Sequence, residues 1–427
     1  MKRAPRVRGR VYLLALLTLA TVALVLYLLR DRADASPPAS APFASLDVTG
    51  SGAHFGARSL TAPGVVGFCL ILEGTGIDPP ATGSLVLEGG GRSLTLAVAL
   101  RRGSTRLCIP ALGIGGFVPS SVSWSFPAAG RPRVVRVEPI SAGSGEPITA
   151  ELGAVLLVER SRWRGADFES YRWSDIPDML VVDTASYELQ DRMFKRLSFF
   201  VEKEGYAGSI PEPEAVADLH GFNAHDYRAE DLARFFAAAS DERIELLPEE
   251  RRLRELLLRA GVLRTEGGRP RAGKGGVISI SRDSTPELRE RLLGHEALHG
   301  LYFTSPAFRA AVASAWNGAS SDLTRFVELY LSRPNWSYDL GNSYLLQNEF
   351  MAYLLQYRRS ELDSQLLGPG AAWIRQSHPD LTAWAERFVR EHRGELFAVY
   401  DALDAELWRE LGVHGGELIR LSLKPER

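Results

Sequence analysis

The stretch Gly-His-Glu-Ala-Leu-His-Gly, residues 294 to 300, decides how the rest of the chain is interpreted. Its two histidines are four residues apart, so on an α-helix they project from one face, one turn apart, as two imidazoles must to share a metal ion. Glu296 follows the first histidine and would lie beside the metal rather than on it. A carboxylate there suits the general base for a zinc-bound water. The stretch therefore predicts a zinc-binding helix.

The residues before this stretch fit a strand followed by the start of a helix. Residues 277–281 alternate Val and Ser with Ile after a Gly-Gly turn, which predicts a short strand. Residues 284–286, Ser-Thr-Pro, supply a capping hydroxyl and an early proline, which are typical of a helix N-terminus. Leu288 and Leu292 share a helical face with both histidines, so we expect these to point into the interior. The alternative is a pair of buried histidines that are merely hydrogen-bonded.

A catalytic zinc keeps three protein ligands and one open position, so a further ligand must come from elsewhere in the chain. The metzincin pattern would need a histidine six residues after His299, but that position is Ser305, so the metzincin class is excluded. Downstream, Glu349 lies in an apolar stretch of helical character, residues 344–357. A carboxylate on an apolar helix needs a partner, and a metal ion is the most economical one.

Together, the two histidines and the later sequence Asn-Glu-Phe-Met-Ala resemble the gluzincin class of zinc metallopeptidases. In that class an H-E-x-x-H helix is followed by a second helix, whose Asn-Glu-x-x-Ala-like motif gives the third ligand. The resemblance implies that His295, His299 and Glu349 bind Zn²⁺. It also implies that Glu296 is the general base. The resemblance covers residues 277 to about 357. The gap between the two motifs is longer than in aminopeptidases. The motif with which aminopeptidases bind a substrate's amino terminus is not found in this sequence. Exopeptidase activity is therefore not implied.

Two other segments carry candidate site residues. In the segment 219–228, Arg228 could bind a substrate carboxylate, and His225 or Tyr227 could stabilise an oxyanion. The alternative is that this segment caps the helix that we expect at residues 230–239.

The second segment lies between the predicted ligands, at residues 302–341, and could fold over the site as a cleft wall. Tyr338 within it is a candidate donor to the transition state, with a packing role as the alternative. His378 and His392 follow in the C-terminal helical region, and we interpret both as surface or capping residues.

The rest of the segment 149–427 is predicted to be mostly helical. Helical character begins at Trp173 and is clearest at residues 187–204, where apolar side chains form one stripe. Residues 241–259 fit a charged amphipathic helix. We therefore predict an α+β, mostly helical, zincin-like metallopeptidase domain at residues 149–427.

The segment 46–148 is predicted to be a small all-β sandwich, because short apolar or alternating runs recur there between Gly- and Pro-rich turns. These runs are residues 65–72, 84–87, 93–100, 105–109, 122–126 and 134–137. The module could bind an envelope glycan or protein, or it could only hold the next domain off the membrane. The chain's two cysteines, Cys69 and Cys108, both lie here, and we favour a disulfide between them.

The N-terminal residues predict a membrane anchor. Residues 1–10 carry five basic residues and no acid, and residues 11–29 are apolar apart from two threonines. This pattern predicts a cytoplasmic tail followed by a transmembrane signal anchor, with the bulk of the chain outside the cytoplasm, in the periplasm of a two-membrane bacterium. Residues 30–45 read as a linker. The alternative is a signal cleaved near residues 33–35, which would release a secreted protein.

Charge and composition narrow the function further. The net charge of −2 offers no surplus of basic residues for phosphates, so nucleic acid is not an expected partner. We therefore predict a membrane-anchored, extracytoplasmic, zinc-dependent metallopeptidase, a hydrolase that cuts a peptide or protein substrate with a zinc-bound water and Glu296 as the base. The alternatives are a catalytically inactive zinc-binding protein and a purely structural or binding protein of the cell envelope.

Overall fold

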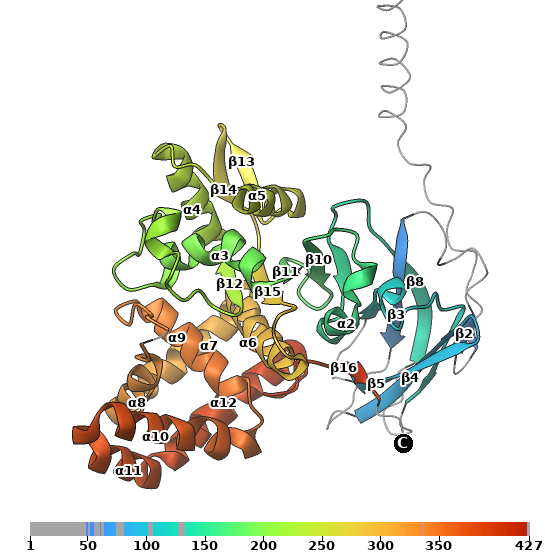
Figure 1. Ribbon diagram of the computed structural model, residues 1–427. Helices are drawn as coiled ribbons and strands as arrows, with labels where there is room; N and C mark the ends of the chain where they lie inside the picture. Colours follow the sequence, from blue (N-terminus) through green and yellow to red (C-terminus); the bar gives the residue numbers. More distant parts are fainter. Residues whose placement is uncertain are drawn as a thin grey trace, which may run out of the picture. The chain divides into compact units, whose positions relative to one another are not determined.

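The computed structural model (Figure 1) describes most of the chain beyond residue 47. The described residues are 48–49, 52–54, 60, 64–73, 81–100, 106–126, 133–334 and 336–424. Leu46 to Arg427 belong to one compact unit. Among the described residues, no helix combines the length and the apolar character that a membrane span requires. The tail, anchor and linker that we predicted at residues 1–10, 11–29 and 30–45 lie outside the described residues.

Strand β15, which precedes the two predicted histidine ligands in the sequence, belongs to a five-stranded mixed sheet. In sheet order the strands are β12 (His225–Arg228), β15 (Gly276–Ser281), β11 (Met179–Thr184), β10 (Phe168–Trp173) and β9 (Ile148–Ala150). β15 pairs in parallel with β11 and antiparallel with β12. β10 pairs antiparallel with β11 and in parallel with β9. The strand predicted at residues 277–281 is confirmed.

Strand β11 lies where we predicted helix from Trp173 onward, so that part of the prediction is wrong. Residues 179–182 are an apolar run without alternation, because the sheet is covered on both faces. Such a run does not show the period of a strand. The helix predicted at residues 187–204 is confirmed as α3 (Tyr187–Glu202), whereas the one predicted at residues 241–259 begins later, at Pro248.

Helices cover both faces of this sheet, because successive side chains of a strand point to opposite sides. On one face, Leu180 and Val277 join a core formed with α3, α4 and α5. On the other face, Val181 and Ile278 join a larger core that includes α6 (Figure 1). The helices are α4 (Ala229–Asp241), α5 (Pro248–Ala260) and α6 (Pro286–Thr304), and a hairpin of β13 (Leu263–Glu266) and β14 (Arg269–Ala272) follows α5.

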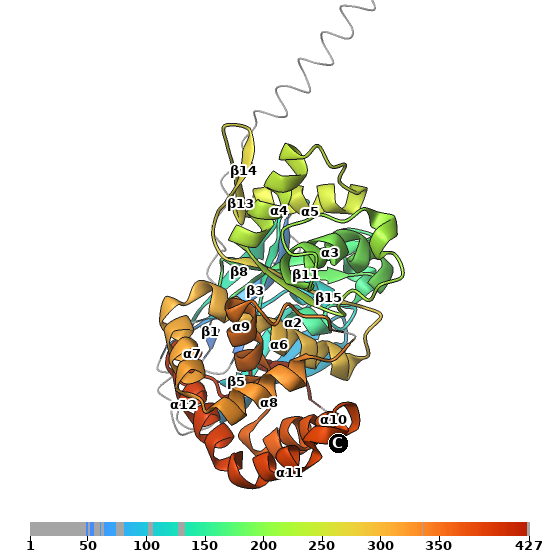
Figure 2. The same ribbon diagram turned by 90° about the vertical axis from the view of Figure 1, so that its left-hand side faces the viewer.

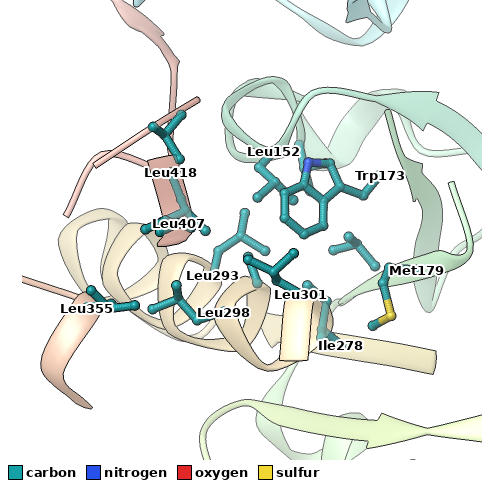
Figure 3. Close-up of a cluster of buried hydrophobic side chains, with 14 of the residues drawn as sticks. Leu152, Trp173, Met179, Ile278, Leu293, Leu298, Leu301, Leu355, Leu407 and Leu418 are labelled. Atoms are coloured by element: carbon teal, nitrogen blue, oxygen red, sulfur yellow. The ribbon is translucent and has the colours of Figure 1, made fainter. Parts of the chain in front are cut away.

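Helix α6 carries the Gly-His-Glu-Ala-Leu-His-Gly stretch and is packed on several sides (Figure 3). Leu293 and Leu301 lie near Trp173 at the end of β10, whereas Leu298 lies near Leu355 of a later helix. A helix with apolar contacts all round is held in the interior. The site therefore has a fixed platform.

The remaining helices follow α6 in sequence (Figure 2). They are α7 (Pro306–Gly318), α8 (Ser321–Leu331), α9 (Ser343–Leu355), α10 (Gly368–Ser377), α11 (Thr382–Glu391) and α12 (Arg393–Leu411). The helical stretch predicted at residues 344–357 is α9. The segment predicted as a cleft wall contains α7, α8 and the loop after α8.

The β-rich segment forms two antiparallel sheets. One has the order β1-β2-β7-β4-β5-β16 and the other has the order β6-β3-β8. Their strands are β1 (Val48–Thr49), β2 (Gly52–His54), β3 (Val65–Glu73), β4 (Ala81–Gly89), β5 (Arg92–Leu100), β6 (Arg106–Ile109), β7 (Ser121–Ser125), β8 (Arg133–Ser141) and β16 (Leu421–Leu423). All six predicted runs coincide with strands.

Two features of this region differ from the expected division of the chain. The boundary expected between residues 148 and 149 falls inside β9, which pairs with β10 of the five-stranded sheet. The C-terminal strand β16 returns to the first sheet and pairs with β5. The two segments are therefore interlocked, because each contributes a strand next to the other.

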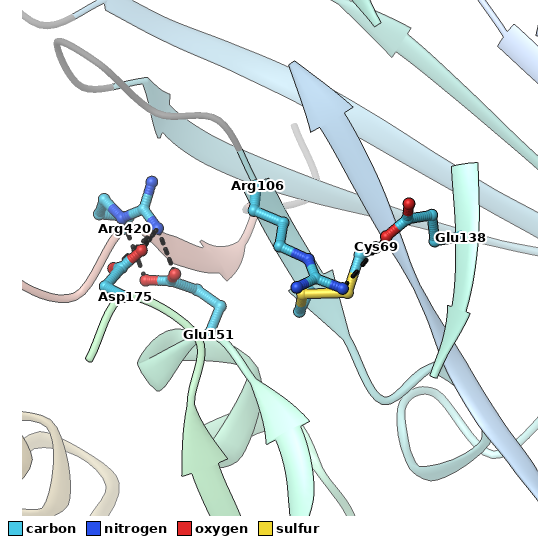
Figure 4. Close-up of a disulfide and its surroundings, with 7 residues drawn as sticks. Cys69, Arg106, Glu138, Glu151, Asp175 and Arg420 are labelled. Carbon is cyan, nitrogen blue, oxygen red and sulfur yellow. Dashed lines mark hydrogen bonds and ion pairs between the residues drawn. A yellow bond between two sulfur atoms is a disulfide. The ribbon is translucent and has the colours of Figure 1, made fainter. Parts of the chain in front are cut away.

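Figure 4 shows two bonds that tie this region together. Cys69 and Cys108 are cross-strand partners on β3 and β6, and they form a disulfide, as we favoured from the sequence. Arg420, next to β16, forms ion pairs with Glu151 and Asp175, and its guanidinium is 2% exposed. Glu151 immediately precedes helix α2 (Leu152–Leu157) and Asp175 follows β10. The end of the chain is thus anchored to the five-stranded sheet as well as to the first one.

Candidate metal centre

The predicted ligands come from two helices with well-defined N-termini. Helix α6 begins after Thr285, whose hydroxyl accepts a hydrogen bond from the Leu288 amide. His295 and His299 are then one turn apart, with ring centroids 4.7 Å apart, and both are buried. Helix α9 begins in the same way after an asparagine cap and carries Glu349, which is 2% exposed. Local capping therefore sets the position from which each ligand is presented.

The three side chains converge on one point. Nε2 of His295 lies 3.6 Å from Glu349 Oε2, and Nε2 of His299 lies 3.8 Å from Glu349 Oε1. Two atoms that each bind zinc at about 2.0–2.2 Å cannot be more than about 4.4 Å apart, and both distances meet this condition. The structure thus brings together the two histidines and the carboxylate, which are fifty residues apart in sequence.

The other nitrogen of each imidazole faces a side chain that can orient it. His295 Nδ1 lies 3.2 Å from Gln356 Oε1, and His299 Nδ1 lies 3.8 Å from Asp226 Oδ2. Because an amide oxygen only accepts hydrogen bonds, Nδ1 of His295 carries the proton and Nε2 keeps its lone pair. Burial lowers the pKa of both histidines to about 4, so both are neutral near pH 7. This is the state in which imidazole binds a metal.

Acidic groups crowd the same place. Burial, reinforced by neighbouring carboxylates, raises the pKa values of Glu296 and Asp226 well above normal and that of Glu202 to about 8. Burial also raises the pKa of Glu349, against the effect of His299 and a hydrogen bond from the Tyr338 hydroxyl. Among the described residues, Oε2 of Glu296 and Oε2 of Glu349 have no hydrogen-bond partner. Buried carboxyl groups with unsatisfied oxygens beside two neutral imidazoles fit a divalent cation.

A second set of possible ligands overlaps the first. Asp226, Glu296 and His299 also lie close enough to share an ion. This set uses the Nδ1 side of His299, whereas the first set uses Nε2 of both histidines. We favour the first set because it leaves Glu296 beside the ion as a base and Asp226 behind His299 as its orienting carboxylate.

A cavity of about 480 Å³ opens onto these groups. Its walls come from β12 and the preceding loop, from α6 and α9, and from the loop after α8. Trp336 and Tyr338 of that loop line it, so the segment predicted to form a cleft wall does line the site. The volume lies within the range of roughly 300–1,000 Å³ that is usual for ligand pockets. It suits a short segment of a substrate rather than a folded protein.

Tyr338 reaches the site but faces a predicted ligand. It is 8% exposed, its ring stacks on Phe222 at 5.4 Å, and its hydroxyl is hydrogen-bonded to Glu349. Burial raises the pKa of Tyr338 well above normal, so the hydroxyl keeps its proton and donates a hydrogen bond to the carboxylate. The residue therefore orients Glu349, and its predicted role as a donor to the transition state stays a prediction.

His225 also lines the cavity, from strand β12 rather than from a helix cap. Its Nδ1 lies 3.1 Å from the Tyr227 hydroxyl, and its buried Nε2 has no hydrogen-bond partner among the described residues. Burial lowers the pKa of His225 to about 3, so the ring is neutral. Arg228 does not line this cavity, because it pairs with Asp231 at 2.8 Å and lies over Tyr344.

The two C-terminal histidines lie outside the site. His392 precedes α12 and pairs with Glu395 at 2.8 Å and with Asp322 at 3.4 Å. His378 follows α10. Neither lines the cavity, in agreement with the capping or surface role that we predicted.

Three residues near the ligands were not singled out from the sequence. Asp226 lies in a segment that we noted, but only the pairing of β12 with β15 brings it to His299. Gln356 is seven residues after Glu349, two helical turns on, which is a signal that could have found it. Glu202 ends α3 and reaches the cavity through packing alone, so no local pattern marks it.

No protein-family model, no curated protein and no solved structure matches this chain. The geometry and chemistry of the site therefore carry the functional argument by themselves. They provide two neutral imidazoles, a buried carboxylate between them, a second carboxylate alongside, and a cavity in front.

Proposed function

We propose that this protein is a zinc-dependent metallopeptidase of the gluzincin type, with His295, His299 and Glu349 as the zinc ligands. One observation carries the proposal. Nε2 of His295 and Nε2 of His299 lie 3.6 Å and 3.8 Å from the two oxygens of one buried carboxylate, and both imidazoles are neutral. Two histidines and one glutamate are a donor set that catalytic zinc sites use, with the fourth position left for water or substrate.

Glu296 is the proposed general base. It lies between the two histidines in sequence and lines the cavity, and its Oε2 has no hydrogen-bond partner among the described residues. When bound, a divalent cation would polarise a peptide carbonyl and favour the ionised form of the surrounding carboxyl groups. Glu296 takes the proton of the attacking water at this oxygen and delivers it to the leaving nitrogen. The neutral ring of His225 and the aromatic ring of Trp336 line the same cavity.

The finer assignments of fold and location belong to the same proposal. We propose a zincin-like fold for residues 149–427 and a sandwich for the β-rich segment. We also propose a single-pass anchor at residues 11–29, with the cytoplasmic tail before it and the rest of the chain outside the cytoplasm. The Cys69–Cys108 disulfide supports this location, because structural disulfides persist in oxidising compartments.

Metal content is the first test. Elemental analysis of the full-length protein, purified without chelators, should find about one zinc per chain. The double variant His295→Ala, His299→Ala should lose it, whereas His378→Ala, which changes a histidine away from the cavity, should keep it. A wild-type protein without metal, or a double variant with full metal content, would contradict the proposed site.

The second test separates an enzyme from a metal-binding protein. Glu296→Gln keeps the shape of the side chain but removes the base, so the variant should retain zinc and lose cleavage of a peptide library by about 10²-fold or more. If wild type holds zinc and cleaves nothing, the protein is the catalytically inactive metal-binding protein of the alternative hypothesis. If the variant cleaves as fast as wild type with full zinc, Glu296 is not the base.

A further inference from the structure

Two arginines line the candidate active-site cavity without an acidic partner. Arg291 on α6 and Arg333 in the loop after α8 both line the cavity. Among the described residues, no carboxylate oxygen lies within 4.0 Å of either guanidinium, and neither donates a side-chain hydrogen bond within the protein. Most other arginines near the fold's core are paired, as Arg289 is with Asp183. The two cavity arginines are therefore available to a ligand.

Arg333 is held in place by aromatic rings instead of by charge. Its guanidinium lies 4.4 Å from the ring centre of Tyr330, 4.8 Å from that of Trp336 and 5.6 Å from that of Trp373. Its Nε is buried and has no hydrogen-bond partner in the described part of the chain. Rings that contact the face of a guanidinium fix its orientation but leave its in-plane N–H donors unsatisfied. A planar, pre-oriented donor of this kind matches a carboxylate.

Arg291 brings a second positive charge to the same end of the cavity. Burial raises the pKa of Tyr330 to about 12 and raises that of Tyr357, and both arginines act against these increases. Both charges are therefore within electrostatic reach of the same two tyrosines. Arg291 is also one helical turn before His295, so the Cβ atoms of these two residues are about 5–6 Å apart on α6.

We propose that Arg291 and Arg333 form a subsite that binds a carboxylate of the substrate, within about two residues of the bond that faces the metal centre. This proposal rests on the proposed peptidase function and names its substrate class. An extended peptide advances about 3.3 Å per residue, which gives the spacing of two residues. The carboxylate is either the C-terminal one or that of an Asp or Glu side chain. The carboxyl groups of Glu202 and Asp226 line the same cavity, and Asp226 Oδ2 lies 3.8 Å from His299 Nδ1.

Binding to the zinc-loaded, full-length Glu296→Gln variant tests the proposal without turnover. The probes are four pools of octapeptides with a neutral N-terminal fluorophore. Each pool combines a free or an amidated C-terminus with either Asp and Glu or Asn and Gln in the sequence. Fluorescence anisotropy should show that carboxylate-bearing pools bind about tenfold or more tightly than the fully amidated pool. Loss of the preference on C-terminal amidation identifies the terminal carboxylate, and loss on side-chain amidation identifies Asp or Glu.

The arginine variants are made in the same background. Arg333→Gln and Arg291→Gln should each abolish most of the preference, Arg333→Lys should keep part of it, and Arg375→Gln, an exposed arginine outside the cavity, should keep all of it. Equal binding of all four pools, or a preference that survives both Gln variants, overturns the proposal. Binding is measured without cleavage, so the two proposals can fail separately. If the variant prefers carboxylate-bearing peptides but the wild type cuts no peptide, the peptidase function is refuted and the carboxylate subsite is retained.

Discussion

Burial fixes the protonation state of the histidines that line the cavity. An exposed histidine has a pKa of about 6.5. His295 and His299 have pKa values of about 4, and His225 has a pKa of about 3, because charged imidazolium is costly away from water. All three are neutral over the physiological range. For the two proposed ligands, neutrality leaves a lone pair for the metal before any metal arrives.

The same burial makes stability depend on pH through His225. Unfolded His225 binds a proton below about pH 6.5, but the folded residue does so only near pH 3, so acid favours unfolding in this interval. From pH 6.5 to pH 5 this histidine should lower the free energy of unfolding by about 2 kcal/mol. In His225→Gln that contribution is absent. Urea denaturation of the metal-free proteins at both pH values measures the difference, and parallel losses in the two proteins would contradict the prediction.

Tyr338 should act on the metal through Glu349. Tyr338→Phe removes the hydroxyl that is hydrogen-bonded to this carboxylate and keeps the ring that stacks on Phe222. Changes behind a ligand typically weaken metal binding about 10–100-fold, so we expect this loss, with kcat nearly unchanged at saturating zinc. Competition with a zinc chelator and steady-state kinetics measure the two quantities. Unchanged zinc affinity with a large fall in kcat would instead assign the hydroxyl to the transition state.

At the scale of elements, helix α6 joins the sheet, the site and the C-terminal helices. It presents His295, Glu296 and His299 from a single rigid segment, while α9 presents Glu349 from a second one. Packing on several sides fixes the direction of α6, and its cap fixes its beginning. The spacing of the proposed ligands thus depends on the contact between two helices rather than on a loop.

The cap of α6 should contribute to stability without affecting the metal. Thr285→Ala removes the acceptor of the Leu288 amide and should lower the free energy of unfolding by about 1 kcal/mol. Thr285→Ser keeps a hydroxyl and should restore most of this loss. Denaturant unfolding checks the values, and zinc content should be equal in both variants because the ligands lie two or more turns further along. A Ser variant as unstable as the Ala variant would show that the hydroxyl does not matter.

The elements that sequence predicted well are those with local signals. Residues 277–281 alternate after a turn, and α6 has a capping hydroxyl with a proline, so both were found. Strand β11 was missed because both of its faces are buried and its residues show no period. His225 was expected either to stabilise an oxyanion or to belong to a helix cap, and the short strand β12 that carries it was not predicted, because its four polar or aromatic residues show no strand pattern. Glu202 reaches the cavity by tertiary packing, which no window of sequence contains.

At the scale of the whole molecule, residues 420–423 connect the first β-sheet to the five-stranded sheet. β16 completes the first sheet beside β5, and Arg420 just before it pairs with Glu151 and Asp175. Gly153 of α2 lies so close to this strand that an added Cβ would be 2.2 Å from the carbonyl oxygen of Leu421. Only glycine allows this approach, so the contact is closely fitted.

Arg420→Met should be among the most costly substitutions outside the site, because the side chain of Arg420 is buried. Arg420→Met removes the cation that neutralises two buried carboxylates, and a loss of about 3–5 kcal/mol in the free energy of unfolding is expected. Arg359→Met, which removes an exposed ion pair with Asp401, should change little. Thermal and denaturant unfolding of the two variants test the contrast. Equal stability of both would show that the buried network contributes nothing.

The position of β16 in the sequence means that its partner strand β5 is synthesised well before it. A ribosome makes the chain from its N-terminus, so β5 is finished long before its neighbour at residues 421–423 exists. During that interval the nine-residue strand β5 has one unpaired edge, and unpaired edges recruit strands from other molecules. A nascent chain therefore needs its β5 edge shielded until residues 421–423 have been synthesised and can pair with it. A chain that stops before residue 421 would keep this edge open to strands of other molecules.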